Sequence, residues 1–210
     1  PHTKPKKDLK TPILDSYKQP LLSNDTKMVD HCIQKVKNGN AIKLLSPTQK
    51  QQLVESLDVL PGIFGNGKGT VGDSTKDCQT IAMHVEHLSF VLQLDKEHLS
   101  TEKTFILMLL RLMMLQPNVD ANTLTHTMKR LISLVDPKND TTPTKSTTLR
   151  SMAWCALSNA VGSLSFEQNL CYLEDDFVQT LVDASMAALS FGQPTQVRQS
   201  ASGLLYNFAL

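Results

Sequence analysis

The chain has 210 residues, of which 40% are hydrophobic and 5% aromatic, and its formal net charge is +1. This length can bury a sizeable core in one or two domains. A net charge so close to zero gives no electrostatic reason to expect nucleic-acid binding, and the scarcity of aromatic residues disfavours a β-sandwich. Because no apolar run reaches about 18 residues, we also expect no membrane span.

Residues 1–24 are polar and basic and show no sustained periodicity. Such a segment is typical of a linker or an extended tail, and it lacks the apolar stretch of a secretory signal. A nuclear-localisation or phosphate-binding role for Lys4, Lys6 and Lys7 remains an alternative. Four widely spaced cysteines without a CxxC pair indicate a reducing compartment, so we expect a cytoplasmic and nuclear protein.

The first helices are predicted from their capping residues. Asn24 or Asp25 caps a helix that runs to about Lys37. Ser46-Pro47 starts a second helix, which the proline and glycine at 61–62 are predicted to end.

The glycine-rich stretch 62–77 is predicted to be a loop. No strand-like alternation competes with helical periodicity in the second half of the chain, so the sequence predicts an all-α fold. Further helices are predicted at 78–93, 101–115, 120–135, 145–162, 174–190 and 195–210.

Two of these helices contain nearly the same sequence. Residues 149–159 align with 197–207 at an offset of 48 positions, which places Asn159 over Asn207. A further shift of 48 places Arg111 in the same register. This period lies at the upper edge of the roughly 40–47 residues of HEAT and armadillo units. We therefore expect an armadillo- or HEAT-like superhelical repeat array with one continuous core and one long concave surface.

The repeated helices carry small residues that would let neighbouring helices approach closely, among them Ala153, Ala156, Ala160, Ala201 and Gly203. The asparagine late in each helix is unfavourable there by a few tenths of a kcal/mol, so it needs a reason. One interpretation is that its amide caps or bridges adjacent repeats. The other is that it pairs with the backbone of an extended ligand.

Residues 151–160, SMAWCALSNA, resemble the third helix of an armadillo repeat, whose groove-lining Trp and Asn bind extended peptides. The order of four segments further resembles the PUL domain of PLAA-type proteins, weakly over 40–210 and better over 99–210. Those segments are ILMLLRLMMLQPNV (106–119), LISLVDPK (131–138), LRSMAWCALSN (149–159) and QSASGLLYNFAL (199–210).

The resemblance implies that residues 25–210 form an armadillo-like PUL domain lacking the family's last repeats. It implies a protein-interaction function: binding the C-terminal tail peptide of the valosin-containing AAA ATPase in ubiquitin-dependent processes, through a basic groove. An arginine can hold a carboxylate in bidentate fashion, although Arg150 and Arg198 could instead salt-bridge a neighbour. The groove residues carried over by position are Arg111, Arg150, Trp154, Asn159, Arg198 and Asn207.

No catalytic or cofactor chemistry is predicted. Residues 65–70 lack the Walker spacing, and Cys78, His84, His87 and His98 match no zinc pattern. The pair His84 and His87, at i and i+3, is expected to be satisfied or exposed. We therefore expect no enzyme activity, cofactor, metal, small-molecule substrate, nucleic acid or membrane partner. The alternatives are a generic armadillo scaffold for another partner, or an appendage of a thioredoxin-like or thiol-isopeptidase protein whose catalytic centre lies outside this chain.

Overall fold

The computed structural model describes residues 26–65, 74–94, 96–116, 119–135, 146–165, 173–190 and 192–208. Within these residues there is no strand, so the all-α fold is confirmed, and no helix is long and apolar enough to cross a membrane. The helices, in chain order, are α2 (Thr26–Lys37), α3 (Ala41–Leu44), α4 (Pro47–Gly65), α5 (Ser74–Leu92), the 3-10 helix η1 (Glu97–Leu99), α6 (Ser100–Met113), α7 (Ala121–Val135), α8 (Thr147–Ser165), α9 (Asp175–Ala188) and α10 (Thr195–Phe208).

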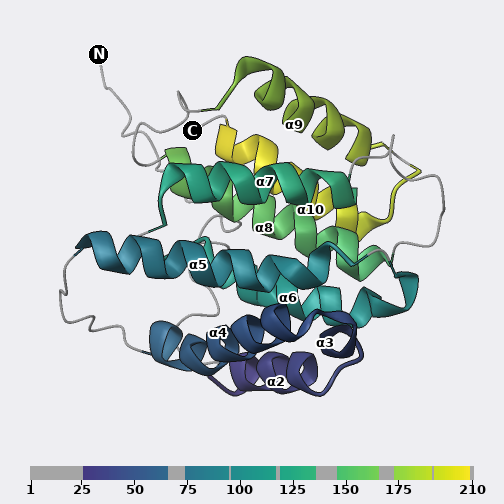
Figure 1. Cartoon of the computed structure of the whole chain (residues 1–210). Coiled ribbons are helices and arrows are strands. Elements are labelled where there is room, and N and C mark those ends of the chain that lie inside the picture. The colour runs from purple at the N-terminus through teal and green to yellow at the C-terminus, as the bar shows by residue number, and fades with distance from the viewer. Residues whose placement is uncertain are drawn as a thin grey trace, which may run out of the picture.

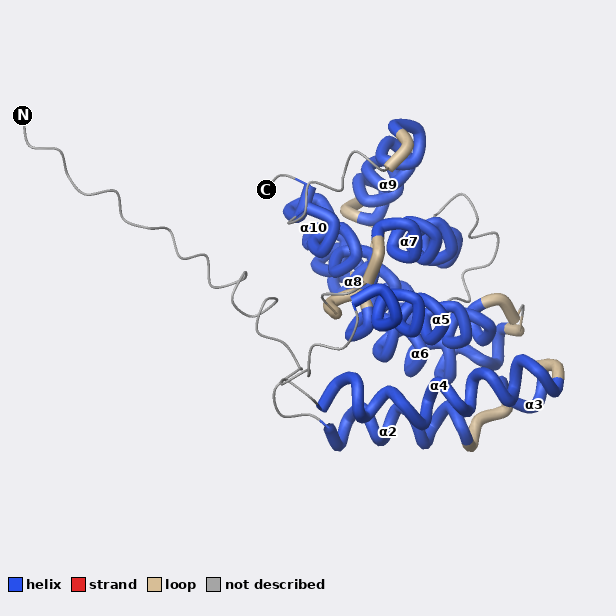
Figure 2. The backbone as a smooth tube through the Cα atoms, turned by 60° about the vertical axis from the view of Figure 1, so that its left-hand side comes forward, coloured by secondary structure: helices blue, strands red, loops and turns tan. Residues whose placement is uncertain are grey.

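The helices stack as pairs in two layers (Figure 1; Figure 2). One layer, called here the α6 layer, contains α2, α6, α8 and α10, each packed against the next. The other, the α5 layer, contains α4, α5, α7 and α9 in the same order. Each helix of one layer also packs against a partner in the other, as α5 does against α6 and α7 against α8. This is the repeat architecture that the register predicts.

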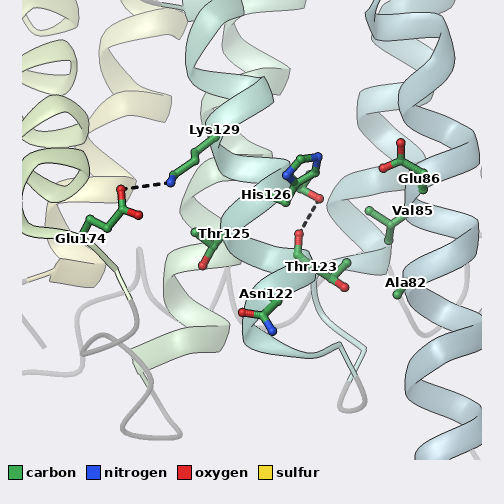
Figure 3. Close-up of a pocket in the computed structure, with 10 residues that line it drawn as sticks. Ala82, Val85, Glu86, Asn122, Thr123, Thr125, His126, Lys129 and Glu174 are labelled. Carbon is green, nitrogen blue, oxygen red and sulfur yellow. Dashed lines mark hydrogen bonds and ion pairs between the residues drawn. The ribbon is translucent and has the colours of Figure 1, made fainter.

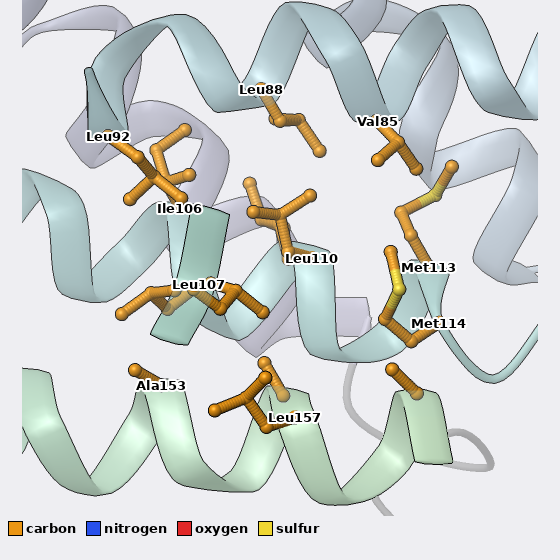
Figure 4. Close-up of a cluster of buried hydrophobic side chains, with 14 of the residues drawn as sticks. Val85, Leu88, Leu92, Ile106, Leu107, Leu110, Met113, Met114, Ala153 and Leu157 are labelled. Carbon is orange, nitrogen blue, oxygen red and sulfur yellow. The ribbon is translucent and has the colours of Figure 1, made fainter. Parts of the chain in front are cut away.

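A continuous apolar core lies between the two layers (Figure 4). Leu88 of α5, Leu110 of α6 and Leu157 of α8 are each 0% exposed, although they come from three successive parts of the stack. Burying one such side chain stabilises the fold by roughly 1.5–3 kcal/mol relative to leaving it in water. Since each helix buries its apolar face only against its neighbours, the stack holds together through these shared contacts.

Small residues bring α8 and α10 close together. A Cβ on Gly203 would lie 3.2 Å from Ser158 Oγ, and one on Gly162 would lie 3.0 Å from Asn207 Nδ2. Both distances are tighter than ordinary van der Waals contact, so these positions leave little room for a side chain. The prediction that small residues allow close approach is thus confirmed at Gly203.

The start of α4 agrees with its prediction, and its end does not. Ser46 and Gln49 form a capping box, in which Gln49 N donates to Ser46 Oγ at 3.3 Å and Ser46 N donates to Gln49 Oε1 at 3.2 Å. The helix then continues through Pro61 to Gly65, because Ile63 and Phe64 pack against the core. The predicted loop at 62–77 is therefore wrong at both ends: 62–65 belong to α4 and 74–77 to α5.

The 48-residue register breaks at the first helical pair, and the topology gives the reason. In the later pairs the helix of the α5 layer comes first along the chain, whereas in the first pair α2 of the α6 layer precedes α4. The first pair thus completes both layers without repeating the sequence pattern. The short helix α3 was not predicted, and the predicted linker at 1–24 lies outside the described residues.

Candidate functional site

The two asparagines of the repeat register bridge successive helices of the α6 layer. Asn159 Nδ2 donates to the backbone oxygen of Arg111 at 3.1 Å, across the 48-residue offset. Asn207 Nδ2 donates to the backbone oxygen of Ser158 at 2.7 Å and to Ser158 Oγ at 3.1 Å. The bridging interpretation of these residues therefore has direct geometric support, while a contact with a ligand remains a proposal.

The hydrogen bond from Asn159 is accepted by a backbone carbonyl near the end of α6 that has no donor within its own helix. Near the end of that helix Leu115 N donates to Leu112 O at 3.2 Å, so it does not donate to Arg111 O. The last four carbonyls of any helix lack intrahelical partners and need other donors. Asn159 thus acts as a C-terminal cap supplied by the neighbouring helix.

The three predicted arginines lie on the three neighbouring helices α6, α8 and α10. Arg150 Nη1 donates to Gln193 Oε1 at 2.9 Å, and Arg198 Nη2 donates to Thr195 Oγ1 at 3.3 Å. These bonds anchor both guanidinium groups to the beginning of α10. The Arg111 side chain is half-buried, and among the described residues no hydrogen bond or ion pair of its guanidinium is found.

Trp154 corrects the sequence-based prediction. The resemblance places its indole on the groove, but the side chain is 1% exposed and belongs to the core of α8. A buried aromatic side chain of this size contributes to stability and offers no surface to a ligand in this arrangement. Its expected role in the groove is therefore wrong for the folded state described.

A polar seam between α8 and α10 escaped the sequence reasoning. The hydroxyl groups of Ser151 and Ser200 lie 2.7 Å apart and share a hydrogen bond, and Cys155 Sγ lies 3.5 Å from Ser200 Oγ. The two serines are 49 positions apart, one more than the repeat offset, so the alignment does not pair them. The seam adds hydrogen bonds to the contact between the helices that carry Asn159 and Asn207.

The α5 layer has a polar pocket of about 590 Å³ beside α5 and α7, shown in Figure 3. Its volume is within the range of ligand pockets. Its charged side chains are already paired: Arg130 donates to both carboxylate oxygens of Glu86 at 2.7 and 2.9 Å, and Lys129 binds Glu174 at 3.2 Å. None of the predicted groove residues lines this pocket, so it is separate from the candidate peptide-binding surface.

Within the described ranges, no group of three or more potential ligand side chains could hold a metal ion. The pair of histidines on α5 is buried and hydrogen-bonded to Ser56, as the prediction of a satisfied pair allows. Comparisons with models of protein families, with curated proteins and with solved structures found no match for this chain. The resemblance to PUL domains therefore rests on the sequence segments themselves.

Proposed function

We propose that this chain is a protein-interaction domain whose α6 layer binds an extended acidic peptide, the C-terminal tail of the valosin-containing AAA ATPase. In this proposal it acts as an adaptor in ubiquitin-dependent processes and catalyses nothing itself. The observation that carries the proposal is the row formed by Arg111, Asn159 and Asn207 on three neighbouring helices.

The chemistry of this row suits an acidic peptide. A guanidinium binds a carboxylate through two parallel hydrogen bonds, and Arg111 has no competing carboxylate among the described residues. The side-chain amide of Asn159 donates from Nδ2 to the Arg111 carbonyl, so the side-chain oxygen of Asn159 takes no part in that bond. Such an oxygen can accept from a peptide N–H, which is how extended segments are held in other grooves.

Isothermal titration calorimetry with the C-terminal peptide of the ATPase tests the proposal. Replacing Arg111 by Ala should weaken binding by about 1–3 kcal/mol, or about 5- to 150-fold in Kd, because one charge-assisted contact is lost. Lys50→Ala is the matched control, since Lys50 is an exposed cation of α4 in the other layer and should leave affinity unchanged. Raised salt should weaken wild-type binding and narrow its difference from Arg111→Ala.

Two outcomes distinguish an error in the assigned binding residue from an error in the proposed function. An unchanged affinity on Arg111→Ala would remove that residue from the binding surface while leaving the function standing. An absence of binding between the tail peptide and the wild-type chain would reject the ATPase as partner. The generic scaffold would then be favoured, and a panel of acidic and neutral peptides would identify the chemistry of its ligand.

A further inference from the structure

A cluster of three buried polar side chains joins α4 to α5, away from the proposed peptide surface. Ser56 of α4 is 0% exposed, and His84 and His87 of α5 are 3% and 8% exposed. Ser56 Oγ lies 2.8 Å from His87 Nδ1 and 2.9 Å from His84 Nδ1, so one hydroxyl bonds both rings. No part of the proposed function uses this cluster.

The hydrogen-bonding capacity of the cluster fits neutral imidazole rings. A neutral ring has one N–H and one bare nitrogen, whereas a protonated ring has an N–H on both nitrogens. His84 Nε2 is buried and has no hydrogen-bond partner among the described residues. When His84 carries its hydrogen on Nδ1, Nε2 holds only a lone pair. A second proton would bury an N–H without an acceptor, together with a positive charge.

We propose that the Ser56–His84–His87 cluster makes the contact between α4 and α5 sensitive to acid, so that mild acidification releases α4 while the rest of the stack stays folded. In the closed arrangement, in which α4 is packed against α5, the hydrogen bonds around His84 fit only the neutral ring. The open arrangement exposes both rings to water, where each takes up a proton freely. Protons therefore favour the open arrangement.

The charged groups around the cluster act mainly on His87. Burial lowers the pKa of both rings, and the neighbouring His87 lowers the pKa of His84 further. Glu86 of α5, the backbone of Gln52 and Glu55 of α4 oppose the effect of burial on His87. From α7, Arg130 reaches this part of α5, but its guanidinium is held by Glu86.

α6, which packs on another side of α5, faces it with the apolar residues Leu110 and Met113 (Figure 4). Among the described residues, only burial and His87 shift the pKa of His84, both downward, and its buried Nε2 has no acceptor for a second proton. Because the ordinary pKa of histidine is about 6.5 and the closed state lowers it, the open state binds more protons below roughly pH 6.5. Opening should thus increase as pH falls through that value and be independent of pH above neutrality.

The position of α4 gives the opening a structural consequence. α4 packs against both α5 and α2, and α2 is the neighbour of α6 in the layer that carries Arg111. An ion pair between Lys37 and Asp58 also joins α2 to α4. Release of α4 would therefore loosen the N-terminal end of that layer and leave α8 and α10 in place.

Hydrogen exchange of the whole chain, followed by mass spectrometry between pH 8 and pH 5.5, tests the proposal. After correction for intrinsic exchange, the opening constant of α4 should rise below about pH 6.5 by up to ten-fold per pH unit for each proton taken up. The opening constants measured for peptides from α8 and α10 should not rise over the same pH range. His84→Gln should reduce this slope, because the amide does not titrate, whereas His98→Gln, at an exposed histidine, should keep it.

Equal pH slopes in α4 and α10 would overturn the proposal, as would an unchanged slope in His84→Gln. If His84→Gln fails to fold, the wild-type protein still decides the question through NMR titration of its histidine rings. A His84 ring that titrates at or above pH 6.5 while α4 remains protected from exchange contradicts the proposal. A ring that stays neutral well below that pH until α4 exchanges supports it.

Discussion

Replacement of Asn159 tests how the α6 layer is held together. Its amide donates to the Arg111 carbonyl at 3.1 Å, and that carbonyl receives no donor from the following turn of its own helix. Asn159→Ala removes a hydrogen bond with a net contribution of about 0.5–1.5 kcal/mol and leaves the carbonyl partly desolvated. Alanine is the better helix former by about half a kcal/mol, which offsets part of this loss. The expected net destabilisation is therefore about 1 kcal/mol.

Asn159→Asp makes the test sharper because aspartate has nearly the same shape as asparagine. At pH 7 the carboxylate only accepts hydrogen bonds, so it would face the Arg111 carbonyl oxygen without a donor. We expect this variant to be about 1 kcal/mol less stable than Asn159→Ala, since repulsion is added to the lost bond. The deficit should shrink as pH falls toward about 4, because the carboxyl takes up a proton in the folded state above its ordinary pKa and regains a donor.

Urea and thermal unfolding measure these differences. For a chain of this size, 1 kcal/mol corresponds to roughly 2–4 °C in Tm. Asn122→Ala is the matched control, because Asn122 is an exposed asparagine of α7, and its effect should stay within about 0.5 kcal/mol. If Asn159→Asp proves as stable as Asn159→Ala at pH 7, residue 159 does not face the Arg111 carbonyl; if Asn159→Ala proves as stable as wild type, the bridging bond contributes nothing measurable.

Four further substitutions test other parts of the fold by the same unfolding measurements. Trp154→Ala should lower the free energy of unfolding by about 3–5 kcal/mol because the indole is fully buried. A loss below about 1 kcal/mol would contradict the burial of this side chain. Asp120→Ala should cost about 1 kcal/mol at pH 7 by removing the cap of α7. Burial alone would raise the pKa of Asp120, but hydrogen bonds from Thr123 outweigh burial and lower that pKa. The difference in unfolding free energy between wild type and Asp120→Ala should therefore vanish as pH falls below 3.8. Gly39→Ala should destabilise by about 1 kcal/mol or more, since its Cβ would lie 2.8 Å from Glu102 Cγ, whereas Gly62→Ala meets nothing within 4 Å and should stabilise α4.

The sequence was most informative where local and tertiary requirements coincide. Helices α6, α8 and α10 could be placed in one register because each must present small and apolar residues at the same positions to its neighbours. The bond from Asn159 to Arg111 spans that same offset of 48 residues. The residue pattern alone was thus enough to predict that these three helices are neighbours, whereas the residues proposed for the groove come from the resemblance to PUL domains.

The sequence was least informative where a distant contact overrides a local rule. Proline is a sound stop signal when nothing else acts, but the burial of Ile63 and Phe64 extends α4 past Pro61. The position of Trp154 on a repeat helix does not tell whether its ring faces a groove or the core. His84 and His87 could be paired by their spacing, yet Ser56, their shared partner, is 31 positions before His87.

The structural role of Asn159 bears directly on how the proposed groove would work. An amide held by one hydrogen bond has lost its rotational freedom before any ligand arrives, so its oxygen can accept a peptide N–H at a lower entropic cost. Bridging and binding are therefore compatible in one residue, and they can be separated by measurement. If Asn159 only bridges, its substitution lowers Tm but leaves peptide affinity unchanged at temperatures well below unfolding. If it also contacts the ligand, affinity falls in Asn159→Ala at those temperatures as well.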